Sequence, residues 1–473
     1  MRSGNSGEPG HPLPRFRLFP NRVCLVIKRK LSYRGVKFFE FKGVTLVEAE
    51  GLRKRTIASQ SSQIFAANFV SGVSGLVALG IIARSSSLVE LGLFSVLVSF
   101  CLAAEALASV QSWQAILYFG SKRNRARRDS DYRDLLSAGF SLDVISLVVG
   151  IGAVVAGIQV IFIGSGSRAD VVFLSLAAAT PFVLSLSSTA GGVLRLNGRV
   201  QTISLHVAFG GLTYVAIAAM LSGLGISTLE GFFFAWVVGQ VVTKAGIIWS
   251  AFRHEPMMKS GVISFWRGFR LLKKHAELRR FIIATMSTSS TRALLGLDTL
   301  LVGVVLGASA AGVYAVAKSV SKLVQKISTP VNQVLLPMFT RLDAEGNRSQ
   351  VGPLAAWIGR IFGFGSLVFW VLFAIWGGHL IELLMGPGLD AAHIPALILL
   401  AGNVAGLFFF GQVPQLLSRG RAGSVAVINI AAAVIYGLFF MAFVTVTPDL
   451  GPALSITLVT IGVVAAQWVM LRK

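Results

Sequence analysis

The sequence predicts an all-α membrane protein with twelve transmembrane helices, and three observations carry this prediction. Of its 473 residues, 54% are hydrophobic and only 13% are charged, whereas about a quarter of the residues in soluble domains are charged. Apolar stretches alternate with short polar connections from residue 61 to the end of the chain. The third observation is that the basic residues lie almost wholly on one side of these stretches.

Each apolar stretch is long enough to span a bilayer, because about 20 helical residues at a rise of about 1.5 Å cross the hydrocarbon core. In chain order the predicted spans are 61–82, 91–118, 136–163, 170–194, 200–223, 229–251, 281–306, 309–340, 354–385, 391–417, 423–446 and 452–471.

The positive charges set the expected orientation. With the N-terminus in the cytoplasm, 35 of the 43 Lys and Arg residues lie in the tail or in connections after even-numbered spans. Arg84 and Arg168 lie on the other side, and the remaining six lie within spans. Because cytoplasmic connections are rich in Lys and Arg, both termini are predicted to be cytoplasmic. The net charge of +23 is then explained by topology and by attraction to anionic membrane lipids, which argues against nucleic-acid binding.

Four regions are predicted along the chain. Residues 1–57 are expected to form a basic, poorly ordered cytoplasmic tail, and residues 58–252 an N-terminal lobe of six helices. Residues 253–280 are expected to be a cytoplasmic amphipathic linker, in which Phe265, Phe269 and Leu272 share one helical face. Residues 281–473 are expected to form a C-terminal lobe of six helices.

The two predicted lobes repeat one another at an offset of 220 to 222 residues. The matching segments are Gly92-Leu93-Phe94 with Gly312-Val313-Tyr314, Asn197-Gly198-Arg199 with Arg419-Gly420-Arg421, and Leu229-Glu230-Gly231 with Asp449-Leu450-Gly451. A repeat of six spans has the same topology twice, so its halves are related by an axis along the membrane normal. This arrangement is typical of transporters with a central cavity.

Charged residues within the spans mark candidate functional positions, since a charge near the midplane costs at least about 2.5 kcal/mol. They are Glu105, Asp143, Lys244, Arg292, Asp298, Lys318, Lys322, Lys326, Arg360 and Glu382. A structural interpretation is favoured for four of them. Lys244 and Arg360 are expected to reach the cytoplasmic surface, Glu382 lies near the outer end of its span, and Asp143 lies near the inner surface.

The cluster on the seventh and eighth spans favours a functional interpretation. Lys318, Lys322 and Lys326 are spaced i, i+4 and i+8, so they form one stripe along a helix. If the two spans form a hairpin, Asp298 lies level with Lys318, and Arg292 lies level with Lys322. We expect Asp298 to pair with Lys318, while Arg292, Lys322 and Lys326 line a water-filled cationic cavity. The alternative is a closed network of salt bridges that binds no ligand.

An anionic cargo fits such a cavity, because Arg and Lys both bind phosphate groups. The sequence has no G-x-x-x-x-G-K-[ST] loop and no nucleophile or metal constellation. Cys24 lies in the tail and Cys101 within a span, so neither suits a zinc motif. We therefore expect no enzymatic activity, no cofactor and no metal site.

The seventh and eighth spans resemble those of bacterial polysaccharide flippases, the O-antigen and exopolysaccharide translocases of the multidrug, oligosaccharidyl-lipid and polysaccharide exporter superfamily. The resemblance extends over about residues 58–473. The residues that carry it are Leu297 to Gly303, Leu306 to Ala317, Pro330, Val331, Leu335, Leu336, Pro337, Met338, the Gly420-Arg421 turn and Leu450 to Leu454.

The resemblance implies a MATE-like, V-shaped fold of two six-helix lobes that alternates access across the bacterial inner membrane. It implies an isoprenoid-diphosphate-linked oligosaccharide as cargo, for lipopolysaccharide or exopolysaccharide biosynthesis. The basic cavity expected of the family maps onto Arg292, Lys318, Lys322 and Lys326. Asp298 and Glu105 are candidates either for coupling transport to protons or sodium or for structural pairing. Glycosyltransferases and a polysaccharide polymerase are further candidate partners, and a monomer is expected.

Three alternatives remain. A cation-coupled multidrug exporter of the same superfamily is the closest, although a positive cavity would repel organic cations. A flippase for a lipid-linked peptidoglycan precursor is disfavoured by the count of twelve spans. A non-transporting structural or polymerase role is the last alternative, and twelve spans without a sizeable external loop argue against a polymerase.

Overall fold

The computed structural model describes residues 46–121, 129–162, 168–274, 296–344, 348–419 and 421–472, with a few positions between 276 and 286. The chain divides into two compact units, residues 1–54 and residues 55–473. The first unit is described only where α1 begins, at Leu46. Everything below concerns the second unit.

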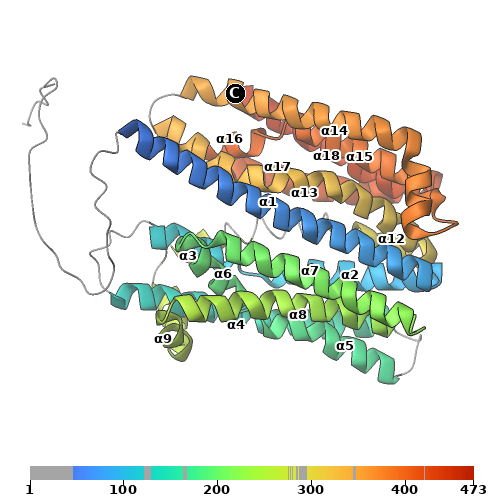
Figure 1. The fold of residues 1–473 in the computed structure, drawn as a ribbon, viewed down its shortest axis with the longest axis horizontal. Helices are drawn as coiled ribbons and strands as arrows, with labels where there is room; N and C mark the ends of the chain where they lie inside the picture. The colour runs from blue at the N-terminus through green and yellow to red at the C-terminus, as the bar shows by residue number, and fades with distance from the viewer. Residues whose placement is uncertain are drawn as a thin grey trace, which may run out of the picture. The chain divides into compact units, whose positions relative to one another are not determined.

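The described chain is helical, and its helices run back and forth across one bundle (Figure 1). The first half contains α1 (Leu46–Ser85), α2 (Leu88–Ala108), α3 (Ser112–Ser121), α4 (Asp129–Ile161), α5 (Arg168–Val183), α6 (Ser187–Leu196), α7 (Val200–Gly223) and α8 (Leu229–His254). Two short helices, α9 (Met257–Ile263) and α10 (Phe265–Lys274), follow. The second half contains α12 (Asp298–Leu306), α13 (Ala308–Ala344), α14 (Arg348–Met385), the 3₁₀ turn η1 (Asp390–Ala392), α15 (His393–Phe408), α16 (Gln412–Ser418), α17 (Ala422–Val446) and α18 (Gly451–Arg472).

The predicted fold class is confirmed. Within the described residues, ten helical segments are long and apolar enough to cross a membrane, and they coincide with ten of the twelve predicted spans. The other two spans are the seventh, of which α12 is the continuously described part, and the eighth, which is α13.

Local chemistry fixes the connections between helices. At the start of α2, the Ser87 hydroxyl accepts a hydrogen bond from the Glu90 backbone N–H, and the Glu90 carboxylate accepts one from the Ser87 backbone N–H. This reciprocal capping box satisfies two N–H groups that lack intrahelical partners. A single residue, Gly307, separates α12 from α13 with a φ of 90°. Glycine adopts this left-handed conformation without strain, so the two helices fold back on each other at once.

Three of the predicted spans are interrupted. α2 and α3 together form the second span, α5 and α6 form the fourth, and α15 and α16 form the tenth. Pro181 lies just before the end of α5. The fourth and tenth spans occupy equivalent positions in the two halves, so the shared interruption extends the repeat from sequence to structure.

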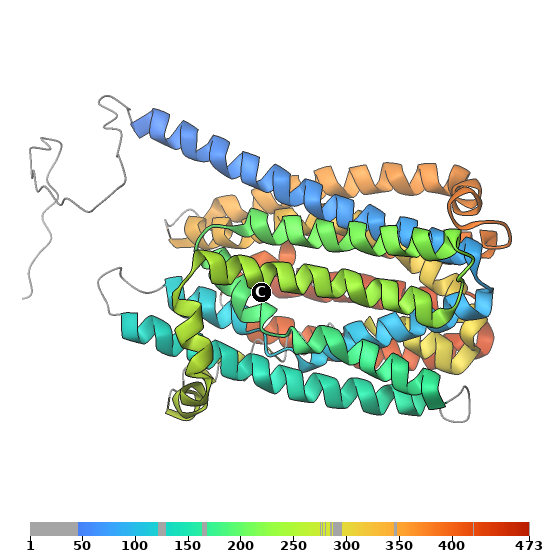
Figure 2. The ribbon, with the colours of Figure 1, turned by 60° about the horizontal axis from the view of Figure 1, so that its bottom comes forward.

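The two halves pack separately and meet along α1 and α2. α7 packs on α8 and α4 on α5 in the first half, while α17 packs on α18 and α14 on α15 in the second. Figures 1 and 2 both show α7 and α8 side by side. We call the helices α1 to α8 of this unit the N-terminal lobe and α12 to α18 the C-terminal lobe. α2 contacts both α12 and α13.

Repeat-related glycines lie where the lobes meet. A Cβ added at Gly312 would lie 3.3 Å from the Gly92 backbone nitrogen, and one added at Gly92 would lie 1.7 Å from the Ala308 carbonyl oxygen. Side chains larger than hydrogen would therefore separate α2 from α13. The contact between equivalent residues is expected at the axis of a parallel repeat.

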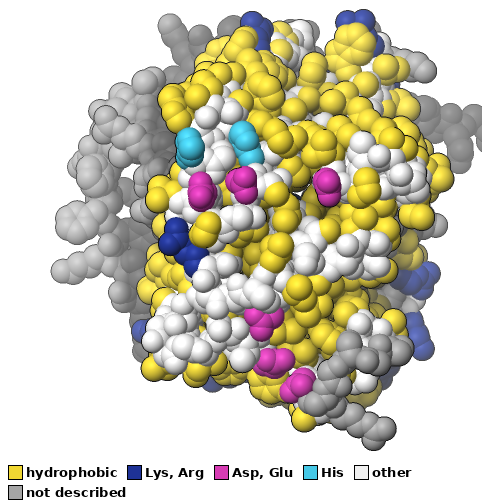
Figure 3. Space-filling model, turned by 90° about the vertical axis from the view of Figure 1, so that its right-hand side faces the viewer, with side chains coloured by type: hydrophobic (Ala, Val, Ile, Leu, Met, Phe, Trp, Pro, Cys, Tyr) yellow, Lys and Arg dark blue, Asp and Glu magenta, His cyan; other side chains and the backbone are white. Residues whose placement is uncertain are grey.

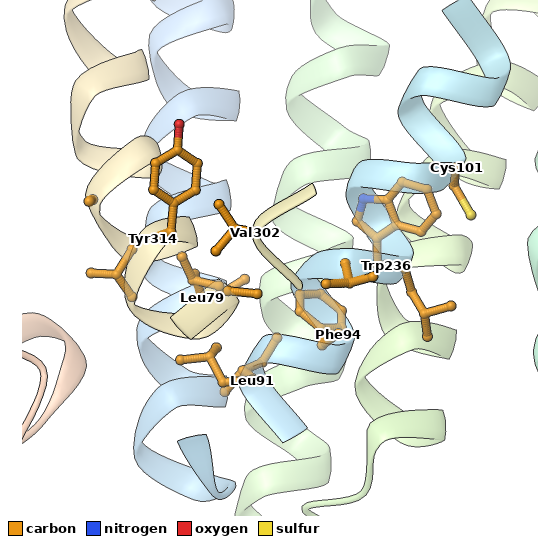
Figure 4. Close-up of a cluster of buried hydrophobic side chains, with 14 of the residues drawn as sticks. Leu79, Leu91, Phe94, Cys101, Trp236, Val302 and Tyr314 are labelled. Atoms are coloured by element: carbon orange, nitrogen blue, oxygen red, sulfur yellow. The ribbon is translucent and has the colours of Figure 1, made fainter. Parts of the chain in front are cut away.

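One apolar core joins the lobes. Leu79, Phe94, Trp236, Val302 and Tyr314 come from α1, α2, α8, α12 and α13 and belong to one cluster of buried side chains (Figure 4). This cluster lies beside the cavity described below and fixes the backbone of each helix that lines it.

The connection between the lobes contains the two short helices α9 and α10. α10 packs on α4, where Gly268 lies against Ser137 and Ser141. Phe265 and Leu272, two of the three apolar residues of the predicted face, pack against buried clusters of the N-terminal lobe. Trp266 is 69% exposed.

One end of the bundle is rich in acidic groups. Figure 3 looks onto the end that holds the turn between α1 and α2. Acidic residues lie in or beside the turns at this end, among them Glu90, Asp170, Glu230 and Asp449. Arg84, one of the two basic residues predicted for this side, donates to the Leu383 carbonyl at the end of α14.

Candidate functional site: a lysine-lined cavity

A cavity of about 440 Å³ lies between the lobes. α1, α2, α7 and α8 of the N-terminal lobe form one wall, and α12 and α13 of the C-terminal lobe form the other. The lining residues from α2 run from Phe94 to Leu102 and those from α13 run from Ala315 to Lys326. The cavity therefore begins beyond the Gly92–Gly312 contact and extends away from the α1–α2 turn.

The two walls differ in chemistry. The N-terminal wall has no charged residue among its described lining and combines apolar side chains and glycines with polar groups that include Ser71, Ser99, Gln240 and Thr243. The C-terminal wall carries Lys318, Lys322 and Lys326. Among the described residues that line the cavity, none is acidic.

The i, i+4, i+8 spacing of the lysines brings all three to the same cavity, because residues four apart lie on one face of a helix. Lys322 is exposed to the open space, and Lys326 is partly buried. Neither has a hydrogen bond or an ion pair among the residues that the structure describes. Two neighbouring cations without acids are unfavourable, so this wall suits either water or an anion.

Lys326 lies against α1. A Cβ added at Gly72 would be 2.7 Å from Cδ of Lys326, so the absence of a side chain at Gly72 makes room for the lysine stem. Across this contact α1 of the N-terminal lobe reaches the lysine stripe of the C-terminal lobe.

Lys318 lies at the edge of the cavity and also contacts Asp298. Its ammonium donates to the Asp298 carboxylate, to the Thr299 hydroxyl at 3.1 Å and to the Gly296 carbonyl at 3.3 Å. Asp298 also accepts from the Tyr314 hydroxyl at 2.8 Å and from the Thr299 backbone N–H at 2.8 Å. The Asp298 side chain is 1% exposed and that of Lys318 14%. The structure therefore contains the ion pair that the hairpin geometry predicts.

Arg292, the fourth basic residue predicted for the cavity, lies outside the described residues. Its place in the site stays a prediction.

Glu105 is not among the residues that line the cavity. It accepts a hydrogen bond from Lys244 at 2.7 Å, which ties α2 to α8. Lys244 also donates to the Pro181 carbonyl at 3.1 Å and is buried. The expectation that Lys244 reaches the cytoplasmic surface is therefore wrong. Sequence spacing gives no sign of this pair, because its partners are 139 residues apart.

Asp143 is buried in the N-terminal lobe, not at its surface. Its carboxylate accepts from the Ser112 hydroxyl at 2.6 Å and from the Thr189 backbone N–H at 3.1 Å. Thr189 is in the first turn of α6, where helix N–H groups carry partial positive charge. Lys244 meets a carbonyl near the end of α5. At the interruption of the fourth span, Lys244 thus lies at the C-terminal end of α5, and Asp143 lies at the N-terminal end of α6.

Arg360 and Glu382 are both exposed on α14. This agrees with the structural interpretation of these two charges.

The sequence matches the profile of a family described as polysaccharide biosynthesis protein, over residues 126–388. This is more than half of the chain. The protein belongs to the polysaccharide biosynthesis protein family. The family and the structural neighbours below are membrane transporters and not enzymes.

The chain is also similar to a curated protein and to several solved structures. The chain is 26% identical over 334 residues to the inner membrane protein YghQ of Escherichia coli strain K12, covering 66% of this chain and 90% of YghQ. An inward-facing multidrug resistance MATE transporter of the MOP superfamily superposes with a TM-score of 0.65 at 16% identity, covering 87% of this chain and 94% of that one. An outward-facing structure of such a transporter gives 0.61 at 15% identity, covering 88% and 94%. At these identities the structural likeness shows the fold alone, which is the MATE-like fold that the sequence predicts.

Proposed function

We propose that this multi-pass transporter is a flippase. Its cargo would be an isoprenoid-diphosphate-linked oligosaccharide, moved across the bacterial inner membrane for the synthesis of a surface polysaccharide such as O-antigen or exopolysaccharide. The observation that carries the proposal is the cavity between the lobes, which holds three lysines and, among its described lining, no acid. The family assignment supports a role in polysaccharide biosynthesis.

The chemistry of the two walls suits the two polar parts of this cargo. Lysine ammonium groups bind phosphate as mobile point charges, without a fixed geometry, so they can hold a diphosphate and still release it. Ser71, Ser99 and Gln240 on the opposite wall offer hydrogen bonds to sugar hydroxyls. The isoprenoid chain would stay in lipid, since transferring its CH₂ groups to water costs about 0.8 kcal/mol each.

Alternating access follows from the contact between the lobes. α2 and α13 are in backbone contact near the α1–α2 turn through Gly92 and Gly312, and the cavity lies beyond this contact. With the N-terminus in the cytoplasm, the contact closes the outer side and the cavity belongs to the inner half. Rocking of the lobes about the cavity would open this contact and release cargo outward.

Single cysteines test the orientation, after Cys24 and Cys101 are replaced by Ser. We expect Ser130→Cys and Ser260→Cys to resist a membrane-impermeant thiol reagent in intact cells, because they lie on the basic side. Ser167→Cys should react. Labelling of Ser130→Cys from outside would overturn the orientation.

A cation-coupled multidrug exporter of the same superfamily is the second candidate, because the solved structures with this fold are multidrug transporters. The lysine wall argues against organic cations as cargo. An exporter would extrude cationic dyes, and those dyes would compete with one another rather than with diphosphates.

The functional test is complementation of a strain that lacks this protein and has lost its surface polysaccharide. Lys322→Ala and Arg292→Ala should each abolish the surface glycan while the protein inserts at its normal level. Lys259→Ala, a matched change at an exposed lysine of α9, should restore the glycan fully. Normal glycan with both Lys322→Ala and Arg292→Ala would exclude the cavity as the cargo path.

We further propose that anionic lipids bind the basic surface, that glycosyltransferases and a polysaccharide polymerase act beside the transporter, and that the protein is a monomer. Co-purification from native membranes with size determination tests each of these points.

A further inference from the structure

Lys318 differs from the other two lysines because it has two possible partners. Its side chain lines the cavity, as those of Lys322 and Lys326 do. Its ammonium also donates hydrogen bonds to Asp298, Thr299 and Gly296. An anion in the cavity therefore competes with Asp298 for the Lys318 ammonium.

Among the described residues, Asp298 forms an ion pair with Lys318 and with no other cation. The titratable groups facing it are Tyr314, Lys318 and Lys322 on α13 and Tyr436 on α17. α2, which also packs on α12, brings the Ser99 hydroxyl to the Gly296 carbonyl instead. Lys322 interacts with Asp298 only through space, with no contact between them. If Lys318 leaves, a buried carboxylate remains among tyrosines and a threonine.

A second observation is that one polar group near Asp298 lacks a hydrogen-bond partner among the described residues. The hydroxyl of Tyr436 is buried and has no hydrogen-bond partner among the described residues. It interacts electrostatically with both Asp298 and Tyr314. Buried hydroxyls normally have a partner, so the Tyr436 hydroxyl is a group that a rearrangement at Asp298 can satisfy.

We propose that Lys318 passes from Asp298 to the diphosphate of the cargo when the cargo binds, and that Asp298 then takes up one proton. The proposal rests on the proposed function and deepens it, because it ties cargo binding to proton binding. The ammonium of Lys318 keeps its charge and changes only its partner. The carboxylate of Asp298 accepts a proton from water, forming one O–H bond, and becomes neutral.

Charge balance favours this exchange. A bare carboxylate buried without a cation is strongly disfavoured, whereas a carboxylic acid can stay hydrogen-bonded to Tyr314 and Thr299. Each bound diphosphate would thus bring one proton with it. By linkage, affinity for the diphosphate falls as pH rises, because protons are taken up on binding.

The test is calorimetric binding of farnesyl diphosphate to the purified full-length protein in detergent, with farnesol as the uncharged control. Titrations at one pH, at which the diphosphate is fully ionised, use two buffers of different ionisation enthalpy and so count the protons taken up. We expect uptake of about one proton per ligand in the wild type, and an affinity that falls as pH rises by up to about tenfold per pH unit.

Three variants separate the contributions of Asp298, Lys318 and Lys326 to diphosphate binding and to proton uptake. Asp298→Asn keeps the shape and one acceptor oxygen but removes the charge that holds Lys318, so it should bind at least about tenfold more tightly and take up no proton. Lys318→Gln should bind more weakly and also take up no proton. Lys326→Gln is the matched control, because Lys326 has no acid partner among the described residues: it should bind more weakly with proton uptake unchanged.

The outcomes distinguish the two proposals. If the wild type binds farnesyl diphosphate no better than farnesol, the proposed function fails. If the wild type binds the diphosphate without taking up a proton, the exchange is excluded and the proposed function stands. Binding to Asp298→Asn that is as weak as, or weaker than, wild-type binding also excludes it. The wild-type proton count decides the matter even if Asp298→Asn does not fold.

Discussion

The two lobes share a backbone plan and treat their buried charges in opposite ways. In the N-terminal lobe Lys244 is paired with Glu105, and Asp143 accepts from Ser112 and the Thr189 backbone. In the C-terminal lobe only Lys318 is paired, and Lys322 and Lys326 face the cavity without acids among the described residues. The two lobes therefore share one fold and differ in their charge balance. In the proposed function, the C-terminal lobe with Lys322 and Lys326 would contact the anionic cargo.

The largest loss of transport is expected from a change at the glycine contact, where repeat-related residues of the two lobes meet. In Gly92→Val a side chain would enter the space of the Ala308 carbonyl, which lies 1.7 Å from an added Cβ. We expect the contact between α2 and α13 to open and transport to be lost completely. In a background without Cys24 and Cys101, Ser99→Cys in the cavity should become reactive to an impermeant thiol reagent from outside.

Gly152→Val is the control, because an added Cβ meets nothing within 4 Å there. It should leave transport and labelling unchanged. Full surface glycan with Gly92→Val would mean that the glycine contact takes no part in gating.

In the N-terminal lobe we expect a smaller effect, which lowers the stability of the protein and does not act directly on transport. Glu105→Ala leaves the buried Lys244 with a carbonyl as its polar partner, and breaking a buried pair in this way costs about 3 kcal/mol or more. Because Glu105 is 40% exposed, we expect the lower end of this range. The readout is the thermal unfolding midpoint in detergent.

The double variant Glu105→Gln with Lys244→Met removes both charges and should recover most of the lost stability and normal transport. A folded double variant that cannot transport would show that this pair belongs to the transport cycle. The comparison between the lobes would then be wrong.

The smallest effect is expected where α1 of the N-terminal lobe contacts Lys326, and it concerns the affinity for a diphosphate ligand. In Gly72→Ala the new methyl group would displace the Lys326 stem, whose Cδ is 2.7 Å from the added Cβ. Because a lysine stem is flexible, we expect the affinity for farnesyl diphosphate to fall only a few-fold, by less than about 1 kcal/mol. Gly75→Ala, where nothing lies within 4 Å, should bind like the wild type. An effect of Gly72→Ala as large as that of Lys326→Gln would show that Lys326 cannot move.

Periodicity and charge were sufficient to predict the helices and their turns. The predicted stretch 200–223 coincides with α7 (Val200–Gly223), and the i, i+4, i+8 lysines share one cavity because helix geometry alone places them on one face. The pairing of Asp298 with Lys318 followed from the short turn at Gly307, which sets the level of each residue in the hairpin.

Contacts between distant helices could not be predicted in this way. Lys244 lies near the predicted cytoplasmic end of its span, so a surface position was the simplest expectation. The actual partner depends on the packing of α2 against α8 and on the interruption after Pro181, which no local pattern encodes. The burial of Asp143 is equally a product of tertiary packing, since its donors are on α3 and α6. Arg292 lies outside the described residues, so its predicted role rests on the sequence.

The central claim is that an anionic cargo is held by the unbalanced charges of the C-terminal lobe. The most direct measurement is the fraction of native lipid-linked oligosaccharide that membrane-impermeant periodate oxidises on the surface of spheroplasts. Lys322→Ala, at equal protein level, should lower this fraction at least about tenfold, since one charge-assisted contact is worth about 1.5 kcal/mol or more. The Glu105→Gln, Lys244→Met double variant should match the wild type. Two results together would contradict the account: oxidation at the wild-type level in Lys322→Ala, and loss of oxidation in the double variant. The cargo path would then lie in the N-terminal lobe.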